Sequence, residues 1–249
     1  MSGAGQPQVA LQRPAFYALR PGGWRDVFTL LHPPYTAWHL SYVAIGAAVA
    51  PHLYAGRLVA TLGAFFLGVG VCAHALDELQ GRPLGTGLPR RLLIGLAAIS
   101  LAGAIGIGIL GAVTVSVTLV PFIAAGTFIV LAYNLELFGG RFHSDFWFAA
   151  AWGAFPAFTA YWANALTLRP AALVAALGCG FVSVAQRRLS TPVRALRRRT
   201  ISLRGEQRLL DGEVIEVDAA SVAAPMEGAL RALSLAMPLL ALALIVARL

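Results

Sequence analysis

Residues 92–133 read LLIGLAAISLAGAIGIGILGAVTVSVTLVPFIAAGTFIVLAY and contain no charged side chain. A helix needs about 20 mostly apolar residues to cross the hydrocarbon core of a bilayer. This stretch is long enough for two such helices, Leu92–Leu110 and Val113–Tyr133, with only Gly111 and Ala112 between them. It therefore predicts a tight pair of membrane-spanning helices.

Five more apolar stretches have a similar composition and a spanning or nearly spanning length. Together the seven stretches predict an all-α, polytopic membrane bundle of about seven transmembrane helices. The chain has 26 glycines, and those within the spans favour close packing between helices. The five further spans are Thr36–Leu53, Leu58–Leu76, Phe146–Ala165, Ala171–Ala185 and Ala229–Val246.

The overall composition excludes several classes of protein. Of the 249 residues, 58% are hydrophobic and only 12% are charged, against about 25% charged in soluble domains. The net charge of +8 would suit nucleic acid, but the apolar spans make a lipid bilayer the expected partner and predict no nucleic-acid partner. Cys72 and Cys179 both lie in apolar stretches, which excludes a disulfide scaffold. The chain has no lysine, which excludes a retinal protein with its Schiff base.

The arginines are distributed unevenly between the predicted loops. When the N-terminus is placed in the cytoplasm, sixteen of the 19 arginines fall on the cytoplasmic side, and only Arg57, Arg169 and Arg248 fall on the other. Cytoplasmic loops carry an excess of basic residues. The sequence therefore predicts an integral, multi-pass protein of the cell membrane with its N-terminus in the cytoplasm and its C-terminus outside.

The spans divide the chain into four parts: a cytoplasmic N-terminal segment, a six-helix transmembrane core, a basic cytoplasmic loop and a last transmembrane helix. In the first part, Trp24, Val27, Phe28 and Leu31 fall on one helical face, which predicts a short helix lying on the membrane surface. The predicted boundaries of the four parts are 1–35, 36–186, 187–227 and 228–249.

The basic loop has two halves of different character. The first half contains six arginines between Arg187 and Arg199, and we expect them to contact anionic lipid head groups. The second half has Asp211-Gly212 between apolar residues, a strong signal for a two-residue hairpin turn. The sequence therefore predicts a small cytoplasmic loop subdomain that contains a β-hairpin.

Polar residues collect at the cytoplasmic ends of the even-numbered spans, which predicts one polar functional site there. A helix brings the side chains of His74, Asp77 and Glu78 onto one face, because their spacing is i, i+3 and i+4. Carboxylates placed in this way favour Mg²⁺, which prefers oxygen ligands, while His74 with Glu78 would suit a transition metal. The other candidates are Tyr133, Asn134, Glu136, Arg141, His143, Asp145, Gln186, Arg187 and Arg188.

One stretch of this site is similar to a known family. Residues 73–87 read AHALDELQGRPLGTG, which resembles the first signature loop of the UbiA-type prenyltransferase superfamily. In that family an Asp-rich motif, Asn-Asp-x-x-Asp-x-x-x-Asp, precedes an Arg-Pro-Leu-x-Ser/Thr-Gly segment. Asp77 matches the central aspartate of the motif, and residues 82–87 match the segment that follows it. Weaker similarities are found in Pro33–Tyr35, Tyr133–Leu137 and Trp152–Pro156, in the order in which the family's helices occur.

The chain also departs from the family pattern. His74 and Gly81 stand where the family has the first and last aspartates of its motif. The family's second Asp-rich motif follows its sixth helix, but the equivalent stretch here, Ser183–Ser190, contains no acidic residue. The family usually has nine spans, whereas this chain has about seven.

The resemblance implies a membrane prenyltransferase that binds an isoprenoid diphosphate at the cytoplasmic face and transfers the prenyl group to an aromatic or lipid acceptor. In the family, two Asp-rich motifs hold Mg²⁺ against the diphosphate; because this chain has one acidic corner, we expect one Mg²⁺ ion held by Asp77 and Glu78. Arginines would bind the phosphate oxygens, for which the planar guanidinium is well suited. The implied catalytic residues are Asp77, Glu78, Glu136, His143 and Asp145. The implied substrate-binding residues are His74, Arg82, Tyr133, Asn134, Arg141, Gln186, Arg187 and Arg188.

Two alternatives stay open at this point. The loss of the second acidic motif suits a protein that kept the UbiA fold without the reaction and binds an isoprenoid lipid, or a partner membrane enzyme through its arginine-rich loop. The second alternative is a metal-dependent membrane enzyme that binds iron or zinc. Its ligands would be His74, Glu78, Glu136, His143 and Asp145.

Overall fold

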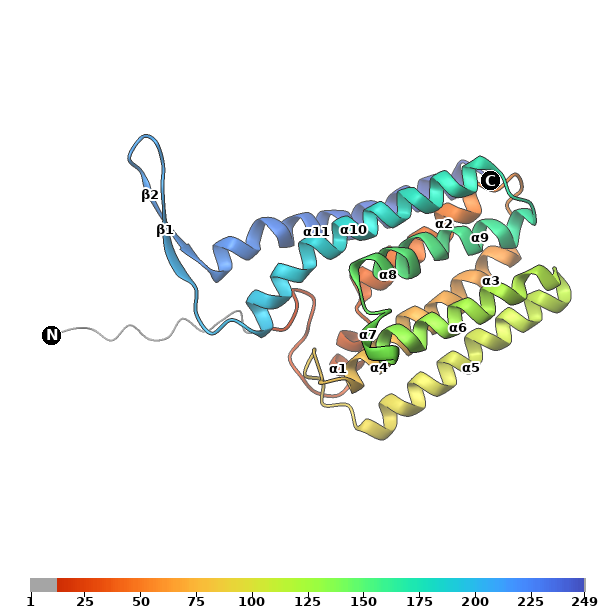
Figure 1. The fold of residues 1–249 in the computed structure, drawn as a ribbon, viewed down its shortest axis with the longest axis horizontal. Helices are drawn as coiled ribbons and strands as arrows, with labels where there is room; N and C mark the ends of the chain where they lie inside the picture. Colours follow the sequence, from red (N-terminus) through yellow and green to blue (C-terminus); the bar gives the residue numbers. More distant parts are fainter. Residues whose placement is uncertain (1–12, 249) are drawn as a thin grey trace.

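Helices make up most of the computed structural model, which describes residues 13–248 (Figure 1). Residues 1–12 of the predicted N-terminal segment, and the last residue of the predicted last helix, lie outside the described residues. Five helices in the described part are long and apolar enough to cross a membrane, which indicates a membrane protein. They are Ala55–Leu79, Arg90–Thr114 (α5), Val117–Asn134, Pro170–Arg198 (α10) and Ala219–Val246 (α11).

Two of these five helices are composed of shorter segments joined end to end. The first consists of α3 (Ala55–Phe65), a π-helical segment η1 (Phe66–Ala73) and α4 (His74–Leu79). The second begins with a 3₁₀ turn η2 (Val117–Leu119) and continues as α6 (Val120–Asn134). π-Helical segments inside α-helices are uncommon and occur frequently at functional sites.

The other two predicted spans are helical as well. The first is α2 (Pro33–Ala48), a helix of 16 residues in which Trp38 and Tyr42 are fully buried. It packs most extensively against α9 and α11, so it lies inside the bundle. The second runs continuously through α8 (Asp145–Ala149), a π-helical segment η3 (Ala150–Ala154) and α9 (Phe155–Ala165).

The helical pair α5 and α6 turns slightly later than the sequence predicts. Helix α5 continues through Gly111 and Ala112 to Thr114. Ser116 then adopts an extended conformation, and its side chain accepts a hydrogen bond from the backbone N–H of Thr118. A serine at this position caps the start of the next helix, so the cap sets the turn rather than the small residues before it.

The predicted boundaries of the basic loop, 187–227, are wrong. Helix α10 extends to Arg198, because arginines in the last turn interact favourably with the negative end of the helix dipole. Helix α11 begins at Ala219, where the Asp218 side chain and Ser221 form a reciprocal N-terminal cap. Only residues 199–218 connect the two helices.

This connection contains an antiparallel β-hairpin formed by β1 (Arg204–Arg208) and β2 (Val214–Asp218). The predicted hairpin is present, but residues 209–213 join its strands in place of the predicted two-residue turn, and Gly212 in this loop has a φ of 88°, a conformation that glycine adopts readily. The hairpin is exposed and projects from one end of the bundle, beyond the neighbouring ends of α10 and α11 (Figure 1).

The two ends of the bundle differ in charge. We call the end that holds α1 (Trp24–Leu30), α4, the start of α8 and the hairpin the arginine-rich end, because arginines are frequent in the segments that lie there, among them the last turns of α10, the start of α5 and β1 (Figure 1). At the opposite end, Arg57 donates to the carbonyl oxygen of Ala163 at 3.2 Å, and Arg248 donates to that of Ala50 at 3.0 Å. Helix α1 leaves Trp24, Val27 and Phe28 exposed, as the interfacial helix predicted there requires.

A buried ion pair joins α10 to α11 at the arginine-rich end. Nε and Nη2 of Arg197 donate to the two carboxylate oxygens of Glu227, and the second of these bonds measures 2.8 Å. Both side chains are less than a tenth exposed. Bidentate pairs of this kind fix the relative position of two elements as well as stabilising them.

We expect Glu227→Gln to lower the free energy of unfolding by about 2 kcal/mol, because a buried hydrogen bond to a charged group loses its ionic character. Thermal unfolding in detergent measures the effect. Glu206→Gln in the exposed Arg208–Glu206 pair is the matched control and should leave stability unchanged. Equal shifts for the two variants would contradict the structural role of Glu227.

Candidate functional site

Polar side chains from the N-terminal segment, α2, α4, α6, α10 and the loop before α8 gather at the arginine-rich end of the bundle. Aromatic contacts, hydrogen bonds and electrostatic interactions connect them into one group. We call this group the polar cluster. Its members are Tyr17, His32, Tyr35, His74, Asp77, Tyr133, His143, Arg187, Arg194 and Arg198.

Helix α4 contributes His74 and Asp77 to the polar cluster. The Nδ1 atom of His74 bonds to the carbonyl oxygen of Gly70 at 3.0 Å, and its ring lies 4.0 Å from the ring of His32. The carboxylate of Asp77 interacts electrostatically with Arg194, Arg198 and His143. Within residues 13–248 Asp77 forms no ion pair, so its oxygens remain available to a ligand.

Glu78, the neighbour of Asp77, points instead into the loop that follows α4. It is fully buried. Its carboxylate accepts hydrogen bonds from the N–H of Leu84 at 3.0 Å and from the N–H and hydroxyl of Thr86, both at 2.8 Å. Both oxygens are therefore occupied by the Arg-Pro-Leu-Gly-Thr-Gly segment, and Glu78 has a structural role in this state.

Arg82 belongs to the same loop and folds back onto it. Its backbone has a φ of 51°, in the left-handed region. Its guanidinium donates to the carbonyl oxygens of Thr86 at 2.7 Å and Leu88 at 3.0 Å. Arg82 thus holds the loop together through the loop's carbonyl oxygens, and its guanidinium bonds to the loop and not to the polar cluster.

If Glu78 anchors the loop and takes no part in catalysis, its substitution should lower stability and leave ligand binding unchanged. We expect Glu78→Gln to lower the free energy of unfolding by about 2 kcal/mol, because the amide accepts fewer and weaker hydrogen bonds than a carboxylate. Thermal unfolding tests the change, and Asp77→Asn, which loses no bond of this kind, is its control. Ligand binding measured below the unfolding transition should be unchanged for Glu78→Gln; a loss of binding without a loss of stability would contradict this role.

The residues do not fit the Mg²⁺ site that the sequence predicts. Both carboxylate oxygens of Glu78 accept hydrogen bonds from the loop after α4, so they do not face a shared ion with Asp77. In the described part of the chain, no three His, Cys, Asp or Glu side chains are positioned to hold a metal ion together. The same orientation of Glu78 removes a ligand from the iron or zinc site considered above. In the polar cluster, the positive charges that would compensate a bound anion are those of the arginines.

Four of the predicted residues meet where α6, α8 and α10 approach one another. The ring of His143 stacks on that of Tyr133 at 4.4 Å, and its Nδ1 lies 3.1 Å from the Tyr133 carbonyl oxygen. Arg187 donates from Nη1 to the Tyr133 hydroxyl at 3.2 Å and from Nε to Asp145 at 2.9 Å. The Arg187–Asp145 pair therefore forms one wall of the polar cluster.

The remaining predicted residues lie elsewhere. Asn134 is buried, and its side chain donates to the carbonyl oxygen of Val130 in its own helix at 2.7 Å. Glu136 is exposed, 3.9 Å from Nδ1 of His143. Arg141 and Arg188 are exposed. Gln186 is buried, and its Oε1 has no hydrogen-bond partner in the described part of the chain.

Sequence reasoning missed Arg194 and Arg198. With Arg187 they have spacings of seven and four residues, which put all three on one face of a helix. This signal required α10 to extend past Ala185, where the sequence analysis ended it. Arg194 donates only to the Thr191 hydroxyl, at 3.2 Å, and has no carboxylate partner within residues 13–248.

The polar cluster is electropositive. Its three arginines face only one unpaired carboxylate, that of Asp77, because Asp145 is paired with Arg187. Burial lowers the pKa of His32 well below its ordinary value, and the charges of Arg194 and Arg198 lower this pKa further, so His32 is neutral at pH 7. The cluster is thus suited to an anion that accepts several hydrogen bonds, such as a phosphate or diphosphate.

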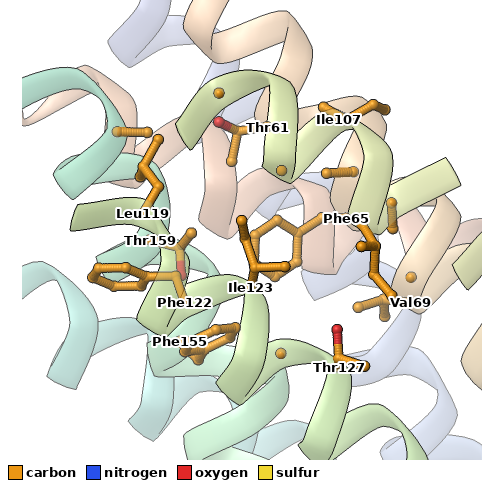
Figure 2. Close-up of a pocket in the computed structure, with 18 of the residues that line it drawn as sticks. Thr61, Phe65, Val69, Ile107, Leu119, Phe122, Ile123, Thr127, Phe155 and Thr159 are labelled. Atoms are coloured by element: carbon orange, nitrogen blue, oxygen red, sulfur yellow. The ribbon is translucent and has the colours of Figure 1, made fainter. Parts of the chain in front are cut away.

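A second feature, an apolar groove, lies between α3, α5, α6 and α9. Its cavity has a volume of about 160 Å³. Figure 2 shows Phe65, Ile123 and Phe155 around this space, together with the threonines Thr127 and Thr159. Apart from Arg57 at the far end and a few threonines, the lining residues are apolar, so the groove is suited to a hydrocarbon chain.

The apolar groove and the polar cluster adjoin each other at Trp152. This side chain lines the groove, and its ring packs edge-to-face against Tyr133 of the polar cluster at 5.4 Å. Its carbonyl oxygen bonds to Nδ1 of His39 at 2.8 Å, from within the π-helical segment η3. A molecule with an anionic head and a long apolar tail matches the two neighbouring sites.

The chain was compared with protein-family models, with curated proteins and with solved structures, and none of them matches it.

Proposed function

We propose that the protein is a UbiA-like membrane prenyltransferase. It binds an isoprenoid diphosphate with the diphosphate in the polar cluster and the isoprenoid chain in the apolar groove, and it transfers the prenyl group to an aromatic or lipid acceptor. The single observation that carries the proposal is the contact of these two sites at Trp152 and Tyr133.

The electropositive character of the polar cluster supports the position of the head group. Arg194 has free donors and no carboxylate partner in the described residues, and Arg187 and Arg198 lie close to it. Guanidinium groups bind phosphate oxygens in a bidentate manner. In the proposed complex they neutralise the charge that develops on the diphosphate as it leaves, which is the task that Mg²⁺ performs in the family that the sequence resembles.

Asp77 is the proposed base. In the reaction, the bond between the allylic carbon and the diphosphate oxygen breaks, and the acceptor forms a new bond to that carbon while losing a proton. Asp77 is the carboxylate of the polar cluster that has no ion-pair partner among the described residues, and it lies beside the arginines. It is therefore suited to receive the proton while the diphosphate leaves with its electron pair.

The proposal includes the orientation of the chain in the membrane. In it, α2 and the continuous helix α8–α9 are the sixth and seventh passes, beside the five apolar helices. The separation of the arginines between the two ends of the bundle supports a cytoplasmic arginine-rich end. The N-terminus then lies in the cytoplasm and the C-terminus outside.

A second function, isoprenoid-lipid binding without transfer, is favoured by one specific observation. Glu78, the proposed partner of Asp77 in metal binding, is occupied by the loop. A protein of this kind would bind the same diphosphate and leave it intact, and could present it to a partner membrane enzyme.

Incubation with radiolabelled geranylgeranyl diphosphate and an extract of membrane lipids, with and without Mg²⁺, separates the two functions. Transfer predicts release of diphosphate together with a labelled, less polar product, both reduced strongly in Asp77→Asn. Binding that leaves the diphosphate intact would favour the second function. The absence of both binding and turnover would contradict the proposal.

A further inference from the structure

Residues 13–19, which we call the N-terminal strap, include a turn closed by a hydrogen bond from the N–H of Ala18 to the carbonyl oxygen of Ala15 at 3.1 Å, and they contribute Tyr17 to the polar cluster. The strap has no regular secondary structure, yet Ala15, Tyr17 and Ala18 are buried. The ring of Tyr17 packs edge-to-face on Tyr35 at 5.5 Å and on His32 at 5.3 Å. The strap therefore packs against His32 and Tyr35 of the cluster.

The strap contacts one of the arginines that an anion would use, because Nε of Arg198 donates to the carbonyl oxygen of Pro14 at 3.1 Å. Burial raises the pKa of Tyr17 well above its ordinary value, while the charges of Arg198 and Arg194 lower this pKa and that of Asp77 raises it. The charges of the arginines that would bind a diphosphate therefore act on Tyr17 as well. The strap and the head group compete for one place.

The arginines that hold the strap in this position donate to neutral carbonyl acceptors and not to carboxylates. Arg197 donates to the carbonyl oxygen of Arg13, and Arg198 to that of Pro14, both at 3.1 Å. At the other end, the N–H of Leu19 donates to the hydroxyl of Thr29 at 3.0 Å. A phosphate oxygen is a stronger acceptor for arginine than a neutral carbonyl, so an anion in the cluster competes successfully for Arg198.

The strap also has a joint that allows it to move. Residues 20–23, Arg-Pro-Gly-Gly, are exposed and connect it to α1. Gly22 and Gly23 have φ angles of 130° and 58°, which other residues adopt rarely. Backbone rotation at these glycines would move the strap relative to α1.

We infer that the N-terminal strap is an autoinhibitory plug, which an isoprenoid diphosphate displaces when its head group binds to Arg194 and Arg198. The inference rests on the proposed function and adds regulation to the same site. It also gives Tyr17 a definite role: the tyrosine occupies the head-group position in the closed state and does not bind the ligand.

Thiol labelling measures the displacement of the strap, with Ala15→Cys as the probe and Arg20→Cys as the exposed control. The native Cys72 and Cys179 are buried and provide the background. Without ligand, we expect the thiol at position 15 to react at least about tenfold more slowly than the thiol at position 20, because it reacts only in the open state. Saturating geranylgeranyl diphosphate should remove most of this difference. Ala18→Cys repeats the experiment if Ala15→Cys does not fold.

The affinity for geranylgeranyl diphosphate is the second measurement. Loosening a plug strengthens ligand binding, whereas removing a ligand-binding residue weakens it. Tyr17→Ala and Thr29→Val, which loosen the strap, should bind geranylgeranyl diphosphate about threefold to tenfold more tightly, since less of the protein is held in the closed state. Thr29→Ser, which keeps the hydroxyl, should bind as the wild type does.

Two results would overturn the inference: weaker or unchanged binding by both loosened variants, or equal labelling at positions 15 and 20 without ligand. Binding of geranylgeranyl diphosphate that leaves the labelling at position 15 slow would overturn the plug and preserve the proposed function. No binding by any variant, Thr29→Val included, would overturn the proposed function and the inference together.

Discussion

Gly46→Ala is expected to destabilise the protein by about 4 kcal/mol or more, or to prevent its folding. Gly46 lies on α2 where this helix crosses α9. A Cβ atom at this position would overlap the carbonyl oxygen of Ala157 and lie 2.8 Å from its Cα. These are backbone atoms, which no side-chain rotation can move, so the central helix α2 would have to separate from α9.

The measurement is thermal unfolding in detergent, with the yield of monodisperse protein as a second readout. Gly95→Ala is the matched control, because Gly95 lies in α5 and a Cβ there would meet no atom within 4 Å. Alanine is the better helix former, so this variant should be as stable as the wild type or slightly more stable. Equal behaviour of the two variants would contradict the backbone contact between α2 and α9.

Arg194→Gln is expected to weaken the binding of geranylgeranyl diphosphate by about 30- to 100-fold. The substitution removes charge-assisted hydrogen bonds to phosphate, each of which contributes about 1.5–3 kcal/mol, and about 1.4 kcal/mol corresponds to a factor of ten in affinity. Because Arg194 has no carboxylate partner among the described residues, its loss leaves no buried carboxylate unpaired. Stability without ligand should therefore change little.

Titration calorimetry in detergent measures this affinity. Arg188→Gln is the control, since it removes an equal charge from the same helix at an exposed position. We expect the control to bind within about threefold of the wild type, because exposed charges are screened by salt. Equal losses in Arg188→Gln and Arg194→Gln would mean that the binding depends on net charge and not on the polar cluster.

The membrane helices could be predicted from the sequence because their signal is local. Long apolar stretches such as residues 92–133 predict helices whatever surrounds them. The boundaries predicted for the basic loop were wrong because they relied on the same local apolar pattern. Arginines from Arg187 onward ended the apolar pattern, but the helix continues to Arg198, since arginine is a good helix former and favours helix C-termini.

The polar cluster could be predicted only in part. The position of Asp77, Tyr133, His143 and Arg187 at one end of the bundle follows from the order of the spans. The separation of Asp77 from Glu78 does not, because it depends on how residues 80–88 fold back over the end of α4. Neighbours in sequence on a helix end can thus have different surroundings, one facing the cluster and the other facing a loop.

The strap and the π-helical segments had no sequence signal that could identify them. Tyr17 lies in a segment without periodicity, and its burial depends on aromatic contacts to residues of other elements, such as Tyr35 of α2. Segment η1 reads like any apolar helix, although its eight residues have the wider hydrogen-bonding pattern. The burial of the strap and the π-helical hydrogen bonding of η1 both depend on tertiary contacts.

In the proposed complex, one ligand occupies the polar cluster and the apolar groove together. The most direct test compares the affinities of geranylgeranyl diphosphate, pyrophosphate and geranylgeraniol for the wild-type protein in the same detergent. Because joining two fragments makes the second contact intramolecular, we predict that the complete ligand binds at least about 100-fold more tightly than either fragment alone. If pyrophosphate or geranylgeraniol bound as tightly as the complete ligand, or if none of the three bound, the account would be contradicted.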